Sequence, residues 1–205
     1  MITYILIFPA AFLIGSLPTG YLVAKSKGID IKAVGSGNIG ATNVTRAMGR
    51  RWGLFVLLID ALKGFVPVFV VKMYFSDVPV TQLYGLMAAA GVLAVAGHVF
   101  TPFLGFKGGK GIATSLGMLL ALSPPFAGIL VAVWLAAFLI TRVSSVGALS
   151  AAIALPFIAF FLFHHKPVSG TMMAFSVLMT VFILFTHREN IQRLYRGEEK
   201  ALKKQ

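Results

Sequence analysis

The sequence contains no cysteine and very few acidic residues, and these absences exclude several kinds of site. Without cysteine the chain can form no disulfide, no thiolate metal site and no cysteine nucleophile. Aspartate and glutamate number only 6, against 18 lysines and arginines, so the formal net charge is +12. The polar loops lack the paired carboxylates that would hold magnesium. We therefore predict that the protein uses no metal and no cofactor.

Charged residues of both signs together are also scarce. They make up 12% of the chain, whereas hydrophobic residues make up 58%; soluble domains have about a quarter charged residues. This composition predicts a multi-pass integral membrane protein, surrounded by membrane lipids and without a nucleic-acid partner. No soluble domain, linker or repeat is evident, so we expect one domain over residues 1–205.

Runs of about 20 apolar residues, long enough to cross a hydrocarbon core of roughly 30 Å, predict the membrane-spanning helices. They lie near residues 2–24, 52–75, 80–100, 146–163 and 170–186. The segment Gly111–Ile140 is ambiguous, because Ser123, Pro124 and Pro125 divide it, and it forms either one broken span or two. A Ser-Pro-Pro run more often marks a turn between helices than a kink.

The placement of lysine and arginine favours two crossings, since cytoplasmic loops are enriched in both residues. Two crossings bring the basic loop after the first span, the basic loop after the third span and the basic tail with Lys200, Lys203 and Lys204 to one side. We therefore predict an all-α integral membrane protein, a seven-transmembrane-helix bundle with its N-terminus outside and its C-terminus cytoplasmic. The segment Gly111–Leu122 is short for a full crossing.

A first polar cluster, GSGNIGATNVTR, runs from Gly35 to Arg46 between two apolar spans. It matches G-x-G-x-x-G, but no strand precedes it and no acidic residue follows on a later strand, so it is not a dinucleotide fingerprint. Glycine lets successive backbone amides form an anion-binding concavity, and arginine binds phosphate through two nitrogens. The cluster therefore predicts a phosphate site, against the alternative of an ordinary polar loop; its candidate ligands are Ser36, Asn38, Thr42, Asn43 and Arg46.

A second cluster, GHVFTPFLGFKGGKG, spans Gly97 to Gly111 at the predicted start of the next helix. It resembles half of a Walker A motif, but Leu104 and Gly111 stand where that motif needs glycine and serine or threonine. We predict a phosphate cradle without nucleotide hydrolysis, formed by Gly108, Gly109 and Lys110 at a helix N-terminus. For Lys107, an ordinary basic loop residue is an equally good interpretation.

A third cluster, HRENIQRL, follows the last span directly. His187 is a candidate general base or oxyanion donor, with Asn190 one turn away on the same helix face. Within the second span, Asp60 and Lys63 stand at i and i+3, which favours a structural ion pair over a transport path, because no other charged residues continue across the bilayer.

Together the three clusters resemble the three signature motifs of the PlsY family, bacterial membrane acyltransferases that transfer acyl groups from acyl phosphate to glycerol 3-phosphate. The resemblance covers the whole chain in order and topology. It implies a bacterial inner membrane location with the active site at the cytoplasmic face, and an active-site serine at Ser144 or Ser145, of which we favour Ser145. It also implies acyl phosphate and glycerol 3-phosphate as substrates.

The resemblance implies that the acyl group is transferred to the 1-hydroxyl of glycerol 3-phosphate, which gives lysophosphatidic acid and phosphate. His187 and Asn190 would then lie beside the reacting groups, while Ser36, Arg46 and Lys110 would bind phosphate with support from Asn38 and Thr42. Either His187 or the substrate phosphate could accept the hydroxyl proton. A serine acyl-enzyme is disfavoured, since no serine has an evident histidine and carboxylate partner in the sequence. The alternative function is a membrane transporter for a phosphorylated metabolite.

Overall fold

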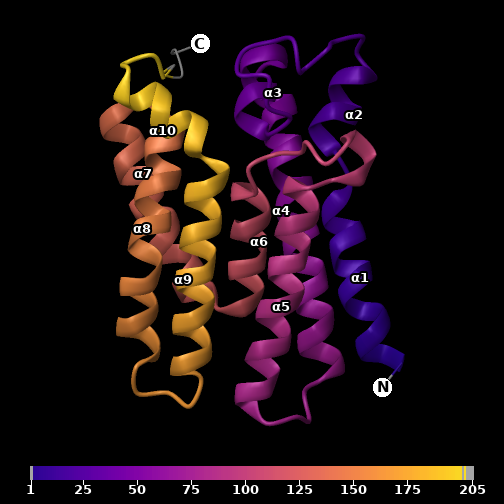
Figure 1. Cartoon of the computed structure of the whole chain (residues 1–205), viewed down its shortest axis with the longest axis vertical. Helices are drawn as coiled ribbons and strands as arrows, with labels where there is room; N and C mark the ends of the chain where they lie inside the picture. Colours follow the sequence, from indigo (N-terminus) through magenta and orange to yellow (C-terminus); the bar gives the residue numbers. More distant parts are fainter. Residues whose placement is uncertain (1, 200, 202–205) are drawn as a thin grey trace.

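The computed structural model describes residues 2–199 and 201, with side chains from residue 6 onward. Helices account for most of this part of the chain (Figure 1). The tail lysines Lys200, Lys203 and Lys204, on which part of the topology prediction rests, lie outside the described residues. The helices, in chain order, are α1 Ile2–Ser16, α2 Thr19–Lys25, α3 Ala41–Met48, α4 Arg50–Tyr74, α5 Val80–Val99, η1 Pro102–Leu104, α6 Ile112–Leu122, α7 Pro124–Thr141, α8 Ser144–Phe163, α9 Ser169–Thr186 and α10 Arg188–Tyr195.

The first predicted span, residues 2–24, is not one continuous helix. It breaks between α1 and α2 at Leu17 and Pro18. Proline lacks a backbone N–H and disfavours helical geometry in the residue before it, which accounts for the break. Pro67 and Pro156 nevertheless lie inside α4 and α8, since neighbouring helices in a bundle can compensate for a lost hydrogen bond.

The ambiguous segment forms two helices, as the basic residues predicted. α6 ends at Leu122 and α7 begins at Pro124, with Ser123 between them in an extended conformation. Six helical segments within the described residues are long and apolar enough to cross a membrane, and α6 is a shorter apolar helix. The number of crossings and the orientation of the termini stay predictions.

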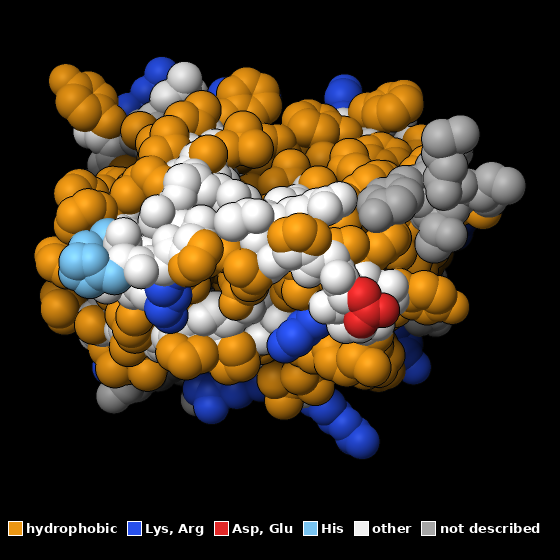
Figure 2. Space-filling view, turned by 90° about the horizontal axis from the view of Figure 1, so that it is seen from below, with side chains coloured by type: hydrophobic (Ala, Val, Ile, Leu, Met, Phe, Trp, Pro, Cys, Tyr) orange, Lys and Arg blue, Asp and Glu red, His pale blue; other side chains and the backbone are white. Residues whose placement is uncertain are grey.

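The two ends of the bundle differ in charge. α3, α10 and the loop before α6 lie at one end, and the start of α1 lies at the other (Figure 1). Figure 2 shows the latter end, where the surface is largely apolar and charged side chains are few. The basic loops gather at the opposite end, which is the arrangement expected of a cytoplasmic face.

The helices pack as two groups. In one, α4 lies against α6 and α1 against α5, and in the other α8 packs against both α7 and α9, while contacts between the groups are fewer. The close approach of α4 and α6 depends on glycine: an added Cβ at Gly64 would lie 1.9 Å from the carbonyl oxygen of Thr114, and one at Gly117 would lie 1.7 Å from that of Ala61.

We expect Gly117→Ala to lower the melting temperature in detergent, because the new methyl group would collide with helix backbone that cannot move aside. Overpacking of this kind typically costs about 1–3 kcal/mol. Gly128→Ala on α7 is the matched control, since no atom lies within 4 Å of its added Cβ. Equal melting temperatures for the two variants would contradict this packing.

Candidate active site

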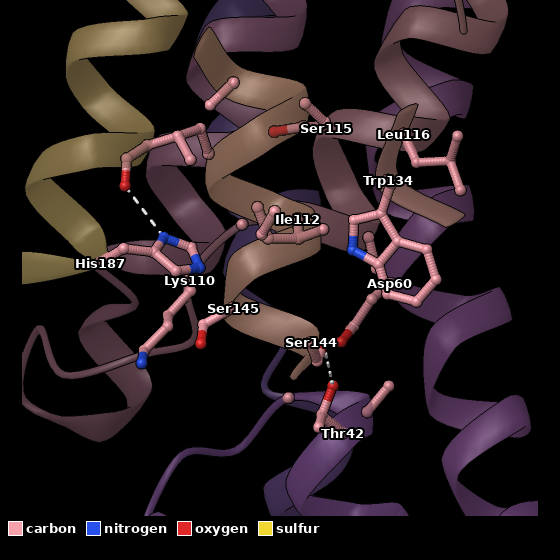
Figure 3. Close-up of a pocket in the computed structure, with 18 of the residues that line it drawn as sticks. Thr42, Asp60, Lys110, Ile112, Ser115, Leu116, Trp134, Ser144, Ser145 and His187 are labelled. Atoms are coloured by element: carbon pink, nitrogen blue, oxygen red, sulfur yellow. Dashed lines mark hydrogen bonds between the residues drawn. The ribbon is translucent and has the colours of Figure 1, made fainter. Parts of the chain in front are cut away.

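A cavity of about 410 Å³ lies between the two groups of helices and opens near the basic end of the bundle. Its rim is formed by polar residues of the loop before α3, the start of α6, the start of α8 and α10. Its deeper walls are mostly apolar and come mainly from α6, α7 and α8, with Asp60 of α4 and His98 of α5 also lining them. The three polar clusters of the sequence therefore meet at one cavity, as predicted. Figure 3 shows one residue of each cluster at this cavity, Thr42, Lys110 and His187.

The first cluster is held together by Asn43, which is 1% exposed. Its side-chain amide nitrogen donates to the carbonyl oxygens of Ile31, Val34 and Asn38, and its Oδ1 accepts from the backbone N–H of Ser36. The sequence predicted that Asn43 donates a hydrogen bond to phosphate, but these bonds already engage its side chain within the loop. Gly35 has φ of 65° and leaves no room for a Cβ beside Asn43 Oδ1.

The other predicted members of this cluster line the cavity. Ser36 is exposed at the rim, and Arg46 is half-buried there. Asn38 accepts a hydrogen bond from the backbone N–H of Gly40 through its Oδ1, at 2.8 Å. The hydroxyl of Thr42 lies 3.3 Å from that of Ser144 on α8. Burial lowers the pKa of the Arg46 guanidinium, but arginine stays charged in proteins.

Gly108 and Gly109 have a different role from the predicted one. Neither lines the cavity, and their backbone N–H groups already donate to the carbonyl oxygens of Val99 and His98, at 2.9 and 3.0 Å. An added Cβ at Gly109 would lie 2.0 Å from Nε2 of His98, and one at Gly108 would lie 2.0 Å from its carbonyl oxygen. Glycine is required here because the loop packs tightly against the end of α5.

Lys110 and the start of α6 are the part of the second cluster that faces the cavity. Lys110, Gly111, Ile112 and Ala113 all line the cavity, and the first N–H groups of a helix have no partner within the helix. The ammonium group of Lys110 donates to Oδ1 of Asn190. Burial, with a contribution from Arg193, lowers the pKa of Lys110 to about 8, against the opposing effect of Glu199. A cationic side chain and a helix N-terminus thus face the same space.

His187 is 3% exposed. Its Nδ1 lies 2.9 Å from the carbonyl oxygen of Ile183, which assigns the ring proton to Nδ1, because a carbonyl can only accept. Figure 3 shows this hydrogen bond as a dashed line at the ring of His187, and Nε2 is then left as an acceptor. Burial is the main cause that lowers the pKa of His187 to about 4, and nearby Lys110 adds to it.

Both candidate serines line the cavity at the first turn of α8. Ser144 contacts Thr42, whereas Ser145 donates a hydrogen bond to Oε1 of Glu199 at 2.7 Å. Asn190, 6% exposed, donates to the same oxygen at 2.5 Å. Ser145, Asn190 and Lys110 are therefore joined in one hydrogen-bonded network, while Ser144 contacts Thr42 of α3 instead.

Sequence reasoning missed Glu199 and Trp134. Glu199 follows α10 in a stretch that reads as a basic tail, so no local pattern indicates that it returns to the cavity. Trp134 lies within an apolar span, and its indole Nε1 is buried without a hydrogen-bond partner among the described residues. It lines the cavity (Figure 3).

Asp60 and Lys63 form the predicted ion pair, with Nζ of Lys63 2.6 Å from Oδ1 of Asp60. The pair also includes residues that the prediction did not contain. Nζ of Lys63 donates to the carbonyl oxygen of Leu17 at 2.5 Å and lies 3.3 Å from Nδ1 of His98. The buried charges therefore tie the break between α1 and α2 to α4 and α5.

The fold and the cavity define a class of protein, a helical membrane protein with a cavity whose polar, cationic mouth opens into a mostly apolar groove. A family model described as glycerol-3-phosphate acyltransferase matches residues 5–197. The chain belongs to this family, and it is a membrane-bound acyltransferase.

Curated relatives and solved structures agree with this assignment. The glycerol-3-phosphate acyltransferase of Geotalea daltonii is 41% identical over 204 residues, with 100% of both chains covered. That of Geobacter sulfurreducens is 43% identical over 205 residues, covering 99% of this chain and 100% of the relative. The crystal structure of PlsY, an integral membrane glycerol 3-phosphate acyltransferase, in its glycerol 3-phosphate form superposes with a TM-score of 0.86 at 38% identity, covering 98% of this chain and 96% of that one.

The lowered pKa of Lys110 predicts an alkaline limit to activity. The cation is present below a pH of about 8 and is lost above it, so kcat/KM for phosphate-bearing substrates should fall as the pH rises through about 8. The pH profile of Lys110→Arg should extend to higher pH, because a guanidinium stays charged. Coincident alkaline limbs in the two proteins, each normalised to its own maximum, would contradict this role of Lys110.

Proposed function

We propose that the protein transfers a fatty acyl group from acyl phosphate to the 1-hydroxyl of glycerol 3-phosphate, forming lysophosphatidic acid and inorganic phosphate. The observation that carries this proposal is that one cavity contains both an apolar groove and two groups of residues suited to bind anions, each with a positively charged side chain. Both substrates carry phosphate, and only the acyl donor carries a long apolar chain. The boundary between the polar rim and the groove lies at Ser144, Ser145 and His187, where the acyl carbonyl would be placed.

The two anion sites are suited to the two phosphates. Arg46, with Ser36 and Thr42, forms one, and Lys110 with the first turn of α6 forms the other. Asn38 supports the first site by holding Gly40. Positive charge and unpaired helix amides stabilise phosphate in both the ground state and the transition state. Bringing the two substrates together in a fixed orientation supplies a large part of the rate enhancement in such transfers.

In the proposed reaction, the hydroxyl oxygen of glycerol 3-phosphate attacks the acyl carbonyl carbon, and the bond from that carbon to the phosphate oxygen breaks. The hydroxyl proton has two possible acceptors. Nε2 of His187 is a weak base, because burial holds the pKa of His187 at about 4, whereas a phosphate group has a second pKa near about 6. We therefore assign the proton to the leaving phosphate. His187 orients the hydroxyl by accepting its hydrogen bond through Nε2.

The alternative function, transport of a phosphorylated metabolite, receives less support. Among the described residues, the charged side chains buried within spans are Asp60 and Lys63, and these are paired with each other. Below the rim the cavity wall is mostly apolar, with residues such as Leu119, Leu130 and Leu155. Asp60 also lines the cavity, but its carboxylate is held by Lys63. Such a wall suits an acyl chain and opposes passage of a phosphate.

An assay with purified protein in detergent tests the proposal. Given acyl phosphate and glycerol 3-phosphate, the protein should release inorganic phosphate and form lysophosphatidic acid in equal amounts. Arg46→Ala should lower kcat/KM by about 100-fold, because a charge-assisted bidentate contact is worth about 1.5–3 kcal/mol. Turnover with acyl-CoA but none with acyl phosphate would overturn the donor assignment, and full activity of Arg46→Ala would remove the first anion site.

The groove should also set the preferred acyl chain length. Ala151 lines the cavity two turns below Ser144, roughly 10 Å along a helix that rises 1.5 Å per residue. Below the groove, the buried rings of Phe126 and Phe163 pack edge to face, with centroids 5.6 Å apart. A larger side chain at position 151 should therefore leave room for shorter chains only.

We expect Ala151→Phe to lower kcat/KM for hexadecanoyl phosphate relative to octanoyl phosphate by about tenfold, a typical effect of changing the size of an apolar pocket. Ile153→Phe on the same helix is the control, because Ile153 is exposed on the outer surface of the bundle and does not line the cavity. The measurement is the ratio of kcat/KM for the two donors. An unchanged ratio in Ala151→Phe would show that the acyl chain does not follow this wall.

A further inference from the structure

Glu199 brings a carboxylate into the centre of the polar network. Its side chain is 10% exposed although it follows the last helix. Oε1 accepts hydrogen bonds from Oγ of Ser145 at 2.7 Å and from Nδ2 of Asn190 at 2.5 Å, and Oε2 accepts from Nε of Arg193 at 2.6 Å. Three donors from α8 and α10 therefore converge on one carboxylate.

These bonds determine which hydrogen-bonding atoms of Ser145 and Asn190 remain available to a substrate. A serine hydroxyl has one hydrogen and two lone pairs. Because the hydrogen of Ser145 is directed to Glu199, Ser145 can only accept a hydrogen bond from a substrate. The same logic applies to Asn190: its amide nitrogen faces Glu199, so its Oδ1 faces Lys110, in agreement with the hydrogen bond from that ammonium group.

The charge of Glu199 is secured by the same contacts. Burial by itself raises the pKa of a carboxyl group, but the hydrogen bonds from Arg193, Ser145 and Asn190 outweigh it and hold the pKa of Glu199 below its usual range. The group is therefore a carboxylate at neutral pH, which has four lone-pair sites and no donor. It is a poor general base but a strong acceptor for several donors at once.

We propose that Glu199 is a positioning residue for acyl transfer: it fixes Ser145 as a hydrogen-bond acceptor toward the 2-hydroxyl of glycerol 3-phosphate, whose attacking 1-hydroxyl donates to His187, and it fixes the Asn190 amide with Oδ1 toward Lys110. This role rests on the proposed function. The competing interpretation is that the carboxylate occupies the place of a substrate phosphate and must leave before the substrate binds. The two interpretations predict opposite kinetic effects.

Glu199→Gln provides the test. Glutamine has nearly the same shape, but its amide offers one acceptor oxygen and two donor hydrogens, so it cannot accept from all three partners. We expect kcat to fall about 10- to 100-fold, since hydrogen bonds to charged groups are among the strongest, with KM for glycerol 3-phosphate changed less than about threefold. Glu198→Gln is the matched control, because Glu198 is the exposed neighbour, and it should behave as wild type.

A lower KM with an unchanged or higher kcat in Glu199→Gln would overturn the positioning role. It would favour the competing interpretation, in which the carboxylate occupies the phosphate site and must leave before the substrate binds. An unchanged kcat and KM would also overturn the positioning role. Failure of the proposed function is distinct from both results, since it would appear as absence of acyl-phosphate turnover in the wild-type protein. The melting temperature of each variant in detergent checks folding, and Glu199→Asp, which keeps the charge, should recover part of kcat.

Coupling between the two residues gives a second measurement. If Glu199 acts through Ser145, its replacement should reduce kcat much less in a Ser145→Ala background than in the wild type, where both partners are present. The design compares wild type, both single variants and the double variant with the same donor. If the fold-reduction of kcat in the double variant equals the product of the reductions in the two single variants, Glu199 does not act through Ser145.

Discussion

The position of Lys110, in the proposed second anion site, depends on one buried ammonium group, Nζ of Lys63. A charge at membrane depth is costly unless it is paired, and Lys63 meets this condition through Asp60 and the carbonyl oxygen of Leu17. That carbonyl lies beside Pro18, at the break between α1 and α2, where the helix has carbonyl groups without helical partners. The break and the buried lysine therefore stabilise each other.

His98 connects this buried ion pair to the loop that carries Lys110 at the cavity. Its ring nitrogen Nδ1 lies 3.3 Å from Lys63, and its carbonyl oxygen accepts from Gly109. Gly108 and Gly109 pack so closely on His98 that neither could carry a side chain. Lys110 follows directly, so its ammonium group is aimed at the cavity by a loop whose backbone is anchored to α5. The ion pair is structural, yet it determines where a functional cation lies.

The sequence was sufficient to predict the spans and the convergence of the three clusters, because apolar run length and basic loops are direct consequences of the bilayer. It was sufficient to separate α6 from α7, since Ser123, Pro124 and Pro125 cannot continue a helix without cost. It could not predict that Asn43 turns inward or that the amides of Gly108 and Gly109 are already bonded. Glycine and asparagine are equally common in structural loops and in ligand-binding loops, and only the path of the backbone distinguishes the two cases. Glu199 gave no local signal because its partners are distant along the chain.

The separation of charge and hydrophobicity in the cavity accounts for the groups that we propose as catalytic. At the polar rim, Arg46 and Lys110 supply positive charge, while Arg193 is paired with the carboxylate of Glu199. His187 lies where the rim meets apolar helices, and the resulting desolvation holds its pKa at about 4. A neutral imidazole adds no further positive charge beside Lys110, and it leaves an acceptor nitrogen for a substrate hydroxyl. An activated acyl donor that brings its own phosphate as proton acceptor suits such a site, because the chain then has to supply orientation and charge but no strong base.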